Sequence, residues 1–151
     1  MKIGIKNDYS SYHKLTGIKM EKTTFEEILN KKGKLIYTNV GNSMFPLIQP
    51  RDLLVITKTD KPLKKFDIPL YKRDSGQYVL HRVIKVRKKD YVLCGDNRSY
   101  RETGITDRHV LGVLTAIIRD GKTLPIDAPQ FRAQTKRLFW RRLRKTVRDK
   151  L

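Results

Sequence analysis

Three short stretches of the sequence carry side chains that together could hydrolyse a peptide or ester bond. Ser43 lies in a turn-forming stretch, His81 lies in a β-rich one, and Asp96 and Asp107 follow further along the chain. A serine hydroxyl becomes a nucleophile when a base takes its proton, and histidine, with an unperturbed pKa of about 6.5, can do this near neutral pH. A carboxylate on the far ring nitrogen would fix the tautomer of the imidazole. The residue types therefore predict Ser43 as nucleophile, His81 as base and one of the two aspartates as third member.

Each stretch also has an ordinary structural explanation when it is taken alone. Ser43 fits an ordinary loop. A lone histidine in a strand, such as His81, often serves only as a structural residue with satisfied hydrogen bonds. The Gly-Asp-Asn stretch that contains Asp96 is typical of a turn. The three histidines and the one cysteine, Cys94, are scattered and make a poor metal site. We therefore expect no metal and no cofactor, and catalysis depends on whether folding brings Ser43 and His81 together.

The elements that must position these residues are mainly short strands. A threonine, Thr23 or Thr24, can cap a short helix that ends at Gly33, with a glutamate three residues after the cap closing a capping box. Beyond it the composition favours strands, and residues 73–76 predict a hairpin turn. We expect strands over 34–40, 53–57, 66–71, 77–86, 90–94 and 110–118. Closely spaced strands joined by turns favour a mainly β fold with a small antiparallel or barrel-like sheet.

The chain has 151 residues, of which 34 are basic and 15 acidic, giving a net charge of +19. This length fits one core, and we divide the chain into a lead-in with a short helix over 1–33, a β domain over 34–120, and a linker with a helix over 121–151. The last segment places apolar side chains at helical spacing among basic ones. It predicts a basic amphipathic helix.

Taken in order, the stretches resemble the type I signal peptidase pattern. The matching residues are Gly-x-Ser-Met-x-Pro-x-Ile at 41–48, Asp52-Leu53, His81-Arg82-Val83, Gly95-Asp96-Asn97, and Asp107 with Gly112. More broadly, the chain is similar to the group of serine peptidases that joins signal peptidases with the self-cleaving SOS repressors. The resemblance covers roughly residues 35–118 and implies a β-rich domain built on a coiled sheet.

The resemblance implies a role for the matching polar residues. Ser43 would be the nucleophile, with its backbone N–H and the Asn42 amide stabilising the oxyanion. His81 stands at the position of the base, which is a lysine in most bacterial signal peptidases and a histidine in those of the endoplasmic reticulum, archaea and sporulating bacteria. Asp107 would assist His81. The choice between Asp107 and Asp96 as third member stays open.

The remaining pattern residues would be structural, since the resemblance implies that Asp96 pairs with Arg82. The chain also departs from the pattern. Gly41 stands where many relatives have a hydroxyl that helps to hold the oxyanion, and Arg51 replaces the usual glycine before Asp52. The hydrophobic anchor that precedes the serine in signal peptidases is missing, and the apolar runs predict neither a signal peptide nor a membrane-spanning segment.

The resemblance implies a serine endopeptidase that forms an acyl-enzyme on Ser43. Its substrate would be a polypeptide with an extended leader or signal segment, bound by strand addition, with small side chains near the scissile bond. The alternative is a noncatalytic basic module that binds nucleic acid or an anionic membrane on a peptidase-like shell. A two-part self-cleaving repressor is less favoured, because the 33 residues before the first strand hold one short helix.

The basic helix has three explanations. Trp140, Arg141 and Arg144 could contact an anionic membrane surface, or the apolar arc could dock on the β domain. Nucleic acid is the least favoured partner. We expect a cytoplasmic or peripherally membrane-associated protein.

Overall fold

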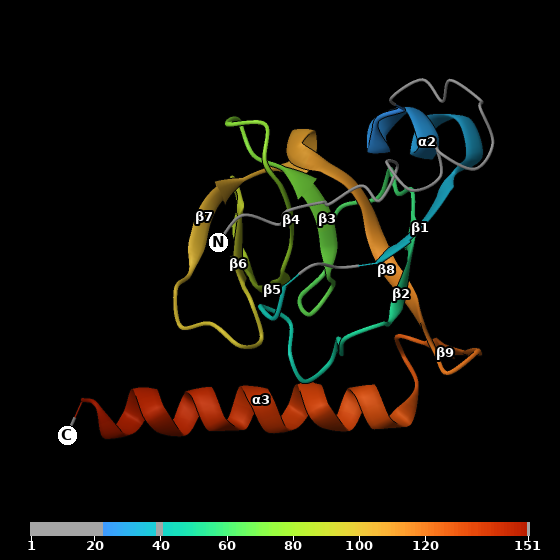
Figure 1. Ribbon diagram of the computed structural model, residues 1–151. Coiled ribbons are helices and arrows are strands. Elements are labelled where there is room, and N and C mark those ends of the chain that lie inside the picture. The colour runs from blue at the N-terminus through green and yellow to red at the C-terminus, as the bar shows by residue number, and fades with distance from the viewer. Residues whose placement is uncertain (1–22, 39–40, 151) are drawn as a thin grey trace.

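The computed structural model describes residues 23–38 and 41–150. In these ranges it contains two α-helices, α2 (Phe25–Lys32) and α3 (Pro129–Arg148), and one 3-10 turn, η1 (Asp107–His109). The strands are β1 (Lys34–Thr38), β2 (Leu53–Thr57), β3 (Pro69–Lys72), β4 (Tyr78–Leu80), β5 (Arg82–Val86), β6 (Tyr91–Cys94), β7 (Glu102–Ile105), β8 (Val110–Arg119) and β9 (Lys122–Pro125). The fold is mainly β, with a short early helix and a long C-terminal one, as predicted (Figure 1).

Helix α2 has the predicted caps. The Thr24 side chain accepts a hydrogen bond from the Glu27 backbone N–H at 3.2 Å, and the Thr24 N–H donates to the Glu27 carboxylate at 2.9 Å. Gly33 ends the helix with φ of 68°, a left-handed conformation that glycine adopts without a Cβ penalty. The helix buries Leu29 against the sheet. The capping box confirms the prediction made from threonine and glutamate spacing.

The strands form two antiparallel sheets. The larger sheet has the order β1-β2-β8-β3-β4, with β9 also paired to β8, and the smaller sheet has the order β5-β6-β7. Strands β1 and β4 are therefore the outer strands of the larger sheet. Phe25 of α2 packs against Tyr37 of β1 and Tyr78 of β4, with ring centroids 5.2 and 5.0 Å apart. One aromatic ring thus bridges the two outer strands of the curled sheet at the end nearest α2.

The segment predicted as one strand over 77–86 is divided at His81. Tyr78–Leu80 pairs with β3 in the larger sheet, whereas Arg82–Val86 pairs with β6 in the smaller one. Period-two alternation cannot show such a division, because Val79 and Val83 on either side are both buried in the same cluster. Sequence patterning also missed β7 and β9, which are short and mostly exposed.

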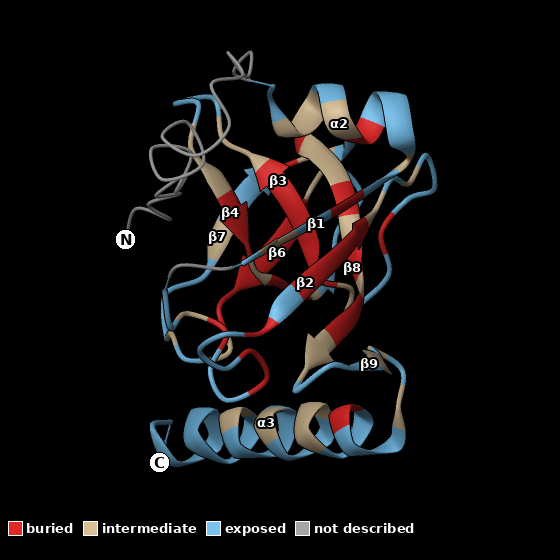
Figure 2. Cartoon of the chain, turned by 45° about the vertical axis from the view of Figure 1, so that its right-hand side comes forward, coloured by how far each residue is buried: buried red, intermediate tan, exposed pale blue. Residues whose placement is uncertain are grey.

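The larger of two buried clusters lies between the larger sheet, α2 and the start of α3, and the second joins residues of the two sheets. Figure 2 shows buried residues along β2, β3 and β8. Helix α3 runs along one end of the β body in both views, and Phe131 in its first turn is only 2% exposed. Among the described residues, no helix is both long and apolar enough to cross a bilayer.

Candidate active site

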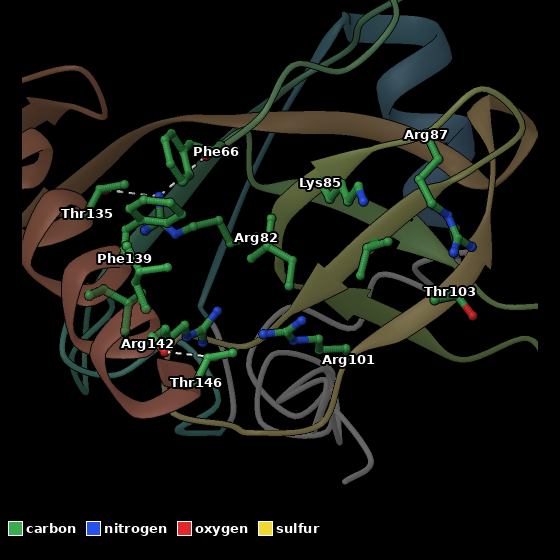
Figure 3. Close-up of a pocket in the computed structure, with 14 residues that line it drawn as sticks. Phe66, Arg82, Lys85, Arg87, Arg101, Thr103, Thr135, Phe139, Arg142 and Thr146 are labelled. Carbon is green, nitrogen blue, oxygen red and sulfur yellow. Dashed lines mark hydrogen bonds between the residues drawn. The ribbon is translucent and has the colours of Figure 1, made fainter. Parts of the chain in front are cut away.

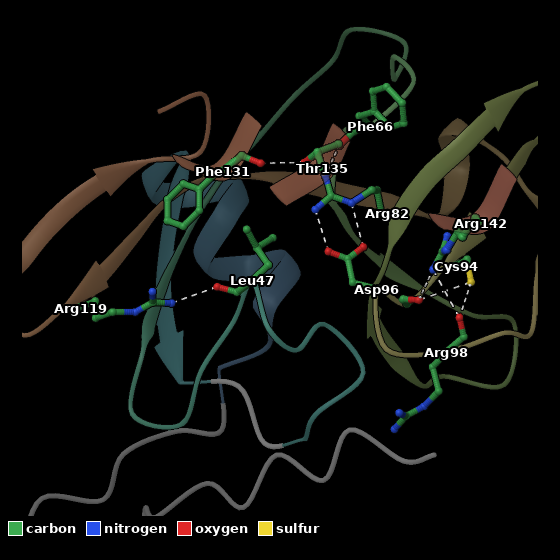
Figure 4. A network of polar contacts seen from close by, with 11 residues as sticks. Leu47, Phe66, Arg82, Cys94, Asp96, Arg98, Arg119, Phe131, Thr135 and Arg142 are labelled. Carbon is green, nitrogen blue, oxygen red and sulfur yellow. Dashed lines mark hydrogen bonds and ion pairs between the residues drawn. The ribbon is translucent and has the colours of Figure 1, made fainter. Parts of the chain in front are cut away.

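Ser43 lies in the loop between β1 and β2, and this loop is anchored at several points. Met44, Leu47 and Ile48 are buried in the core, so the residues that follow the serine cannot move freely. Arg119 of β8 donates to the Leu47 carbonyl oxygen at 2.9 Å (Figure 4). It also pairs with the buried Asp52 carboxylate at 2.6 Å. Ser43 itself stays partly exposed. The loop therefore presents its serine from a fixed backbone.

Arg51 stands where the signal peptidase pattern has a glycine, and its backbone has a conformation typical of glycine. Arg51 has φ of 72°, in the left-handed region where glycine is favoured. For a residue with a Cβ this conformation costs roughly 1–2 kcal/mol. The turn before Asp52 is therefore retained without the glycine.

A second loop, residues 95–98, holds the serine loop in place. The Asn97 backbone N–H donates to the Ser43 carbonyl oxygen at 2.8 Å, and the Asn97 side chain donates to the Asn42 carbonyl oxygen at 3.1 Å. Arg98 donates to the Asn42 side-chain oxygen at 2.7 Å. The side-chain oxygen of Asn42 is thus engaged by a guanidinium. These contacts join two stretches that lie more than fifty residues apart in the chain.

The backbone of Ser43 and the ring of His81 meet at Gly95. A Cβ built on Gly95 would lie 2.6 Å from the Ser43 carbonyl oxygen and 3.2 Å from Nε2 of His81. The first distance is shorter than real Cβ atoms show and the second is tight, so the absence of a side chain at Gly95 lets both groups lie this close to it. The structure therefore brings the Ser43 backbone and the His81 ring together at Gly95, and Nε2 is the ring atom closest to this point.

The other ring nitrogen of His81 faces a tyrosine and a glutamate. Nδ1 lies 3.4 Å from the Tyr71 hydroxyl oxygen, and that hydroxyl donates to the Glu102 carboxylate at 2.8 Å. Glu102 is held in turn by Arg73. Because the Tyr71 hydroxyl donates its hydrogen bond to Glu102, the Tyr71 oxygen can only accept a hydrogen bond from Nδ1–H of His81. This network assigns the neutral ring a hydrogen on Nδ1 and leaves Nε2 free as an acceptor.

Burial keeps the His81 ring neutral. It lowers the pKa of His81 to about 4, with the nearby charge of Glu102 opposing the shift and those of Arg73 and Arg98 adding to it. Burial and the Glu102 carboxylate both raise the pKa of Tyr71, so its hydroxyl keeps its hydrogen. At neutral pH the ring is therefore unprotonated at Nε2; burial disfavours the imidazolium and the nearby Glu102 charge favours it.

Two arginines, Arg82 and Arg142, hold the 95–98 loop in place (Figure 4). Arg82 makes a bidentate pair with Asp96 at 2.8 Å for both hydrogen bonds, and both side chains are about 95% buried, with exposed fractions of 5% and 4%. Arg142 of α3 donates to the Gly95 carbonyl oxygen at 2.8 Å. The pair between Asp96 and Arg82 is the contact that the sequence resemblance implied. Helix α3 is thus bonded directly to the glycine at which Ser43 and His81 meet.

One family model covers most of the chain. The family model described as Peptidase S24-like matches residues 4–127, which include both loops and all of the strands. The chain belongs to the Peptidase S24-like family. No curated protein and no solved structure matches it. The S24-like match supports the broader group of serine peptidases in the sequence resemblance, and the family also includes members without catalysis. The matched range ends two residues before α3.

The structure does not place Asp107 beside His81, where the resemblance implied it would lie. Its carboxylate accepts a hydrogen bond from the Tyr91 hydroxyl at 2.5 Å. The Tyr91 hydroxyl oxygen also accepts a hydrogen bond from the Leu63 backbone N–H. None of the contacts that the structure gives to His81 involves Asp107. The carboxylate that reaches His81 is Glu102, through Tyr71. Asp107 lies in η1, one turn beyond β7, and this turn directs it toward Tyr91 instead.

Sequence reasoning missed Tyr71 and Glu102. Tyr71 is fully buried in β3 and reads as an ordinary core aromatic residue. Glu102 lies in the polar stretch between the Gly-Asp-Asn turn and Asp107, and its isolation as the one glutamate there is the only signal that could have drawn attention to it. Their partnership arises because β3 of one sheet faces β7 of the other.

The three residues predicted to contact a membrane are at the surface. Trp140 is 57% exposed, and Arg141 and Arg144 are also exposed on α3. Among the described residues, no group of three or more His, Cys, Asp or Glu side chains is arranged to hold a metal ion.

Proposed function

We propose that this S24-like protein is a serine endopeptidase of signal peptidase type that cuts a leader or signal segment through an acyl-enzyme. The observation that carries the proposal is the meeting of the Ser43 backbone and Nε2 of His81 at Gly95. Ser43 Oγ attacks the scissile carbonyl carbon while its proton passes to Nε2 of His81. The imidazolium then gives that proton to the leaving amine, and water hydrolyses the acyl-enzyme by the reverse route.

The Tyr71–Glu102 pair supplies the third member of this mechanism. The imidazolium formed in the transition state carries hydrogens on both nitrogens, and Nδ1–H then points at an oxygen polarised by a carboxylate. The Glu102 charge favours the charged ring, whereas burial disfavours it. His81 is therefore a weak base at rest that becomes more basic as negative charge develops on the oxyanion beside it.

An extended substrate would pair with the outer strands of the larger sheet. Strand β1 leads into the Ser43 loop and β4 leads directly into His81, so a peptide strand added beside these edges would pass the two groups. At the end nearest α2, Phe25 contacts both outer strands through Tyr37 and Tyr78. An extended segment of a few residues is the substrate shape that these edges favour.

Covalent labelling tests the proposal without a known substrate. A fluorophosphonate probe should label the folded protein once, at Ser43, as identified by intact mass and peptide mapping. Ser43→Ala should abolish labelling and His81→Ala should slow it by about 10²-fold or more, while Ser75→Ala in the exposed 73–76 turn should leave the rate unchanged. Labelling that persists in Ser43→Ala, or its absence from the folded wild-type protein, rejects the mechanism and favours the noncatalytic basic module.

A further inference from the structure

The second half of α3 presents an apolar face that the β domain does not cover. In its first half, Phe131 is buried and Thr135 accepts a hydrogen bond from Arg82 at 3.1 Å. Phe139 then makes an edge contact with Phe66, with ring centroids 5.8 Å apart. The apolar side chains that follow at helical spacing remain exposed: Trp140 by 57%, Leu143 by 42% and Val147 by 54%.

A groove lies between α3 and the smaller sheet and continues this face (Figure 3). It has a volume of about 490 Å³. Its apolar walls include Ile84, Leu138 and Phe139. Leu143 lines both this groove and a second hollow on the outer side of α3, beside Trp140 and Val147. The apolar surface is therefore continuous from the groove, over Leu143, to the outer face of the helix.

The charged side chains that line this surface are all basic, and three of them, Arg82, Arg87 and Arg148, are paired with an aspartate beside it. Among the described residues that line the groove and the outer hollow, there are several arginines and a lysine but no aspartate or glutamate. Figure 3 shows Lys85 and Arg101 from the sheet and Arg142 from the helix around the groove. The sequence from Lys136 to Arg148 holds seven basic residues and no acidic one. A partner that covers this surface must supply apolar groups and negative charge together.

We propose that the second half of α3, with the groove beneath it, is a docking surface for an anionic phospholipid bilayer. Trp140, Leu143 and Val147 would enter the boundary between headgroups and acyl chains, and the arginines beside them would meet the headgroup phosphates. Tryptophan suits this boundary because its ring is apolar at one end and donates a hydrogen bond at the other. Nucleic acid would neutralise the arginines but leave the apolar stripe in water.

Docking at this surface would place the candidate active site beside the bilayer. Arg142, on the same helix, is bonded to the Gly95 carbonyl oxygen, and Gly95 adjoins Ser43 and His81. On its other flank, α3 borders the serine loop at Phe45 and the 95–98 loop at Asn97. The proposal concerns lipid binding alone and stands whether or not Ser43 is a nucleophile.

Trp140 allows a direct test because it is the only tryptophan in the chain. The full-length protein is mixed with phosphatidylcholine vesicles, with or without phosphatidylglycerol, and Trp140 emission and co-sedimentation are followed. With phosphatidylglycerol, the emission should shift to the blue and most of the protein should sediment. Both responses should weaken steeply as salt is raised. Unchanged emission, or equal binding to uncharged vesicles, overturns the proposal.

Matched variants locate the surface. Leu143→Glu with Val147→Glu should weaken sedimentation by more than about tenfold, since it places charge where the acyl chains lie. Ile36→Glu, at another exposed apolar residue on β1 (53% exposed), should leave it unchanged. Arg144→Glu with Arg148→Glu should weaken binding by about tenfold or more, whereas Lys31→Glu with Lys32→Glu on α2 should have a much smaller effect. Equal losses of vesicle binding in the helix variants and their controls overturn the proposal. A blue shift of Trp140 emission with polyglutamate or duplex RNA, without a shift on vesicles, overturns it as well.

Discussion

The Tyr71 hydroxyl donates to the Glu102 carboxylate at 2.8 Å while its oxygen lies 3.4 Å from Nδ1 of His81. These two residues come from different sheets, β3 and β7. Their contact decides which ring nitrogen of His81 carries the hydrogen and therefore which one can act as a base. In this S24-like chain, a tyrosine stands between the imidazole and the carboxylate.

The Tyr71–Glu102 pair should control the rate at which Ser43 reacts. Tyr71→Phe removes the oxygen that accepts from Nδ1, and Glu102→Gln removes the negative charge that favours the imidazolium. We expect each to slow fluorophosphonate labelling by roughly 10²-fold, the lower end of the contribution of a general base. In the same assay Asp107→Asn should have little effect. A large loss in Asp107→Asn with none in Glu102→Gln would restore the aspartate as the third member.

The labelling rate should persist to unusually low pH. Because burial lowers the pKa of His81 to about 4, the ring stays neutral, and able to accept a proton, as the pH falls through 6.5 and protonates only near pH 4. We therefore expect the acid limb of the pH–rate profile near pH 4. The His81 ring resonances, followed by NMR in the Ser43→Ala protein, should titrate at the same pH. An acid limb near 6.5 would show that the ring is solvated.

The same shift makes stability depend on pH. Between about pH 6.5 and pH 4 the unfolded chain binds a proton at His81 that the folded protein does not. The contribution of His81 to the free energy of unfolding should therefore fall as the pH is lowered through this window. Urea unfolding at a series of pH values should show a slope here that is smaller in His81→Ala. An equal slope in both proteins contradicts the assignment.

Gly95 should tolerate no side chain. Gly95→Ala would put its Cβ 2.6 Å from the Ser43 carbonyl oxygen, which is backbone and cannot swing away. We expect a loss of about 1–3 kcal/mol in the free energy of unfolding and a large drop in the labelling rate, because the serine loop and the His81 ring are pushed apart. Ser99→Ala, at the exposed position that follows the 95–98 loop, is the control and should behave as wild type. A fully reactive Gly95→Ala protein would mean that Ser43 and His81 do not meet here.

Breaking the buried Arg82–Asp96 ion pair should lower the free energy of unfolding more than breaking an ion pair at the surface. Asp96→Ala leaves a guanidinium that is 5% exposed without its carboxylate and should lower the free energy of unfolding by about 3–5 kcal/mol. Arg108→Ala, which breaks an ion pair with Asp74 at the surface, should change it little. Urea unfolding of the two variants gives the comparison. Similar small losses in both would show that water reaches the Arg82–Asp96 pair.

The sequence alone determined those features that depend on neighbouring residues. The caps of α2, strand β2 and the hairpin turn at 73–76 follow from local preferences, and the structure has them. The amphipathic character of α3 follows from spacing in the same way. The order of the motifs also led to Ser43 and His81, because the types of residue and their sequence context identify a nucleophile and a base.

Only the tertiary structure decided which groups meet. The division of the predicted strand at His81, the approach at Gly95 and the choice of Glu102 over Asp107 all depend on how two sheets are placed against each other. Contacts between residues far apart in the chain are set by packing of the whole core, and no local pattern records them. Packing also decided which part of α3 is covered, because the spacing of its apolar residues predicts only that they share one arc. Packing against the β domain covers Phe131 at its start and leaves Trp140 and Val147 exposed.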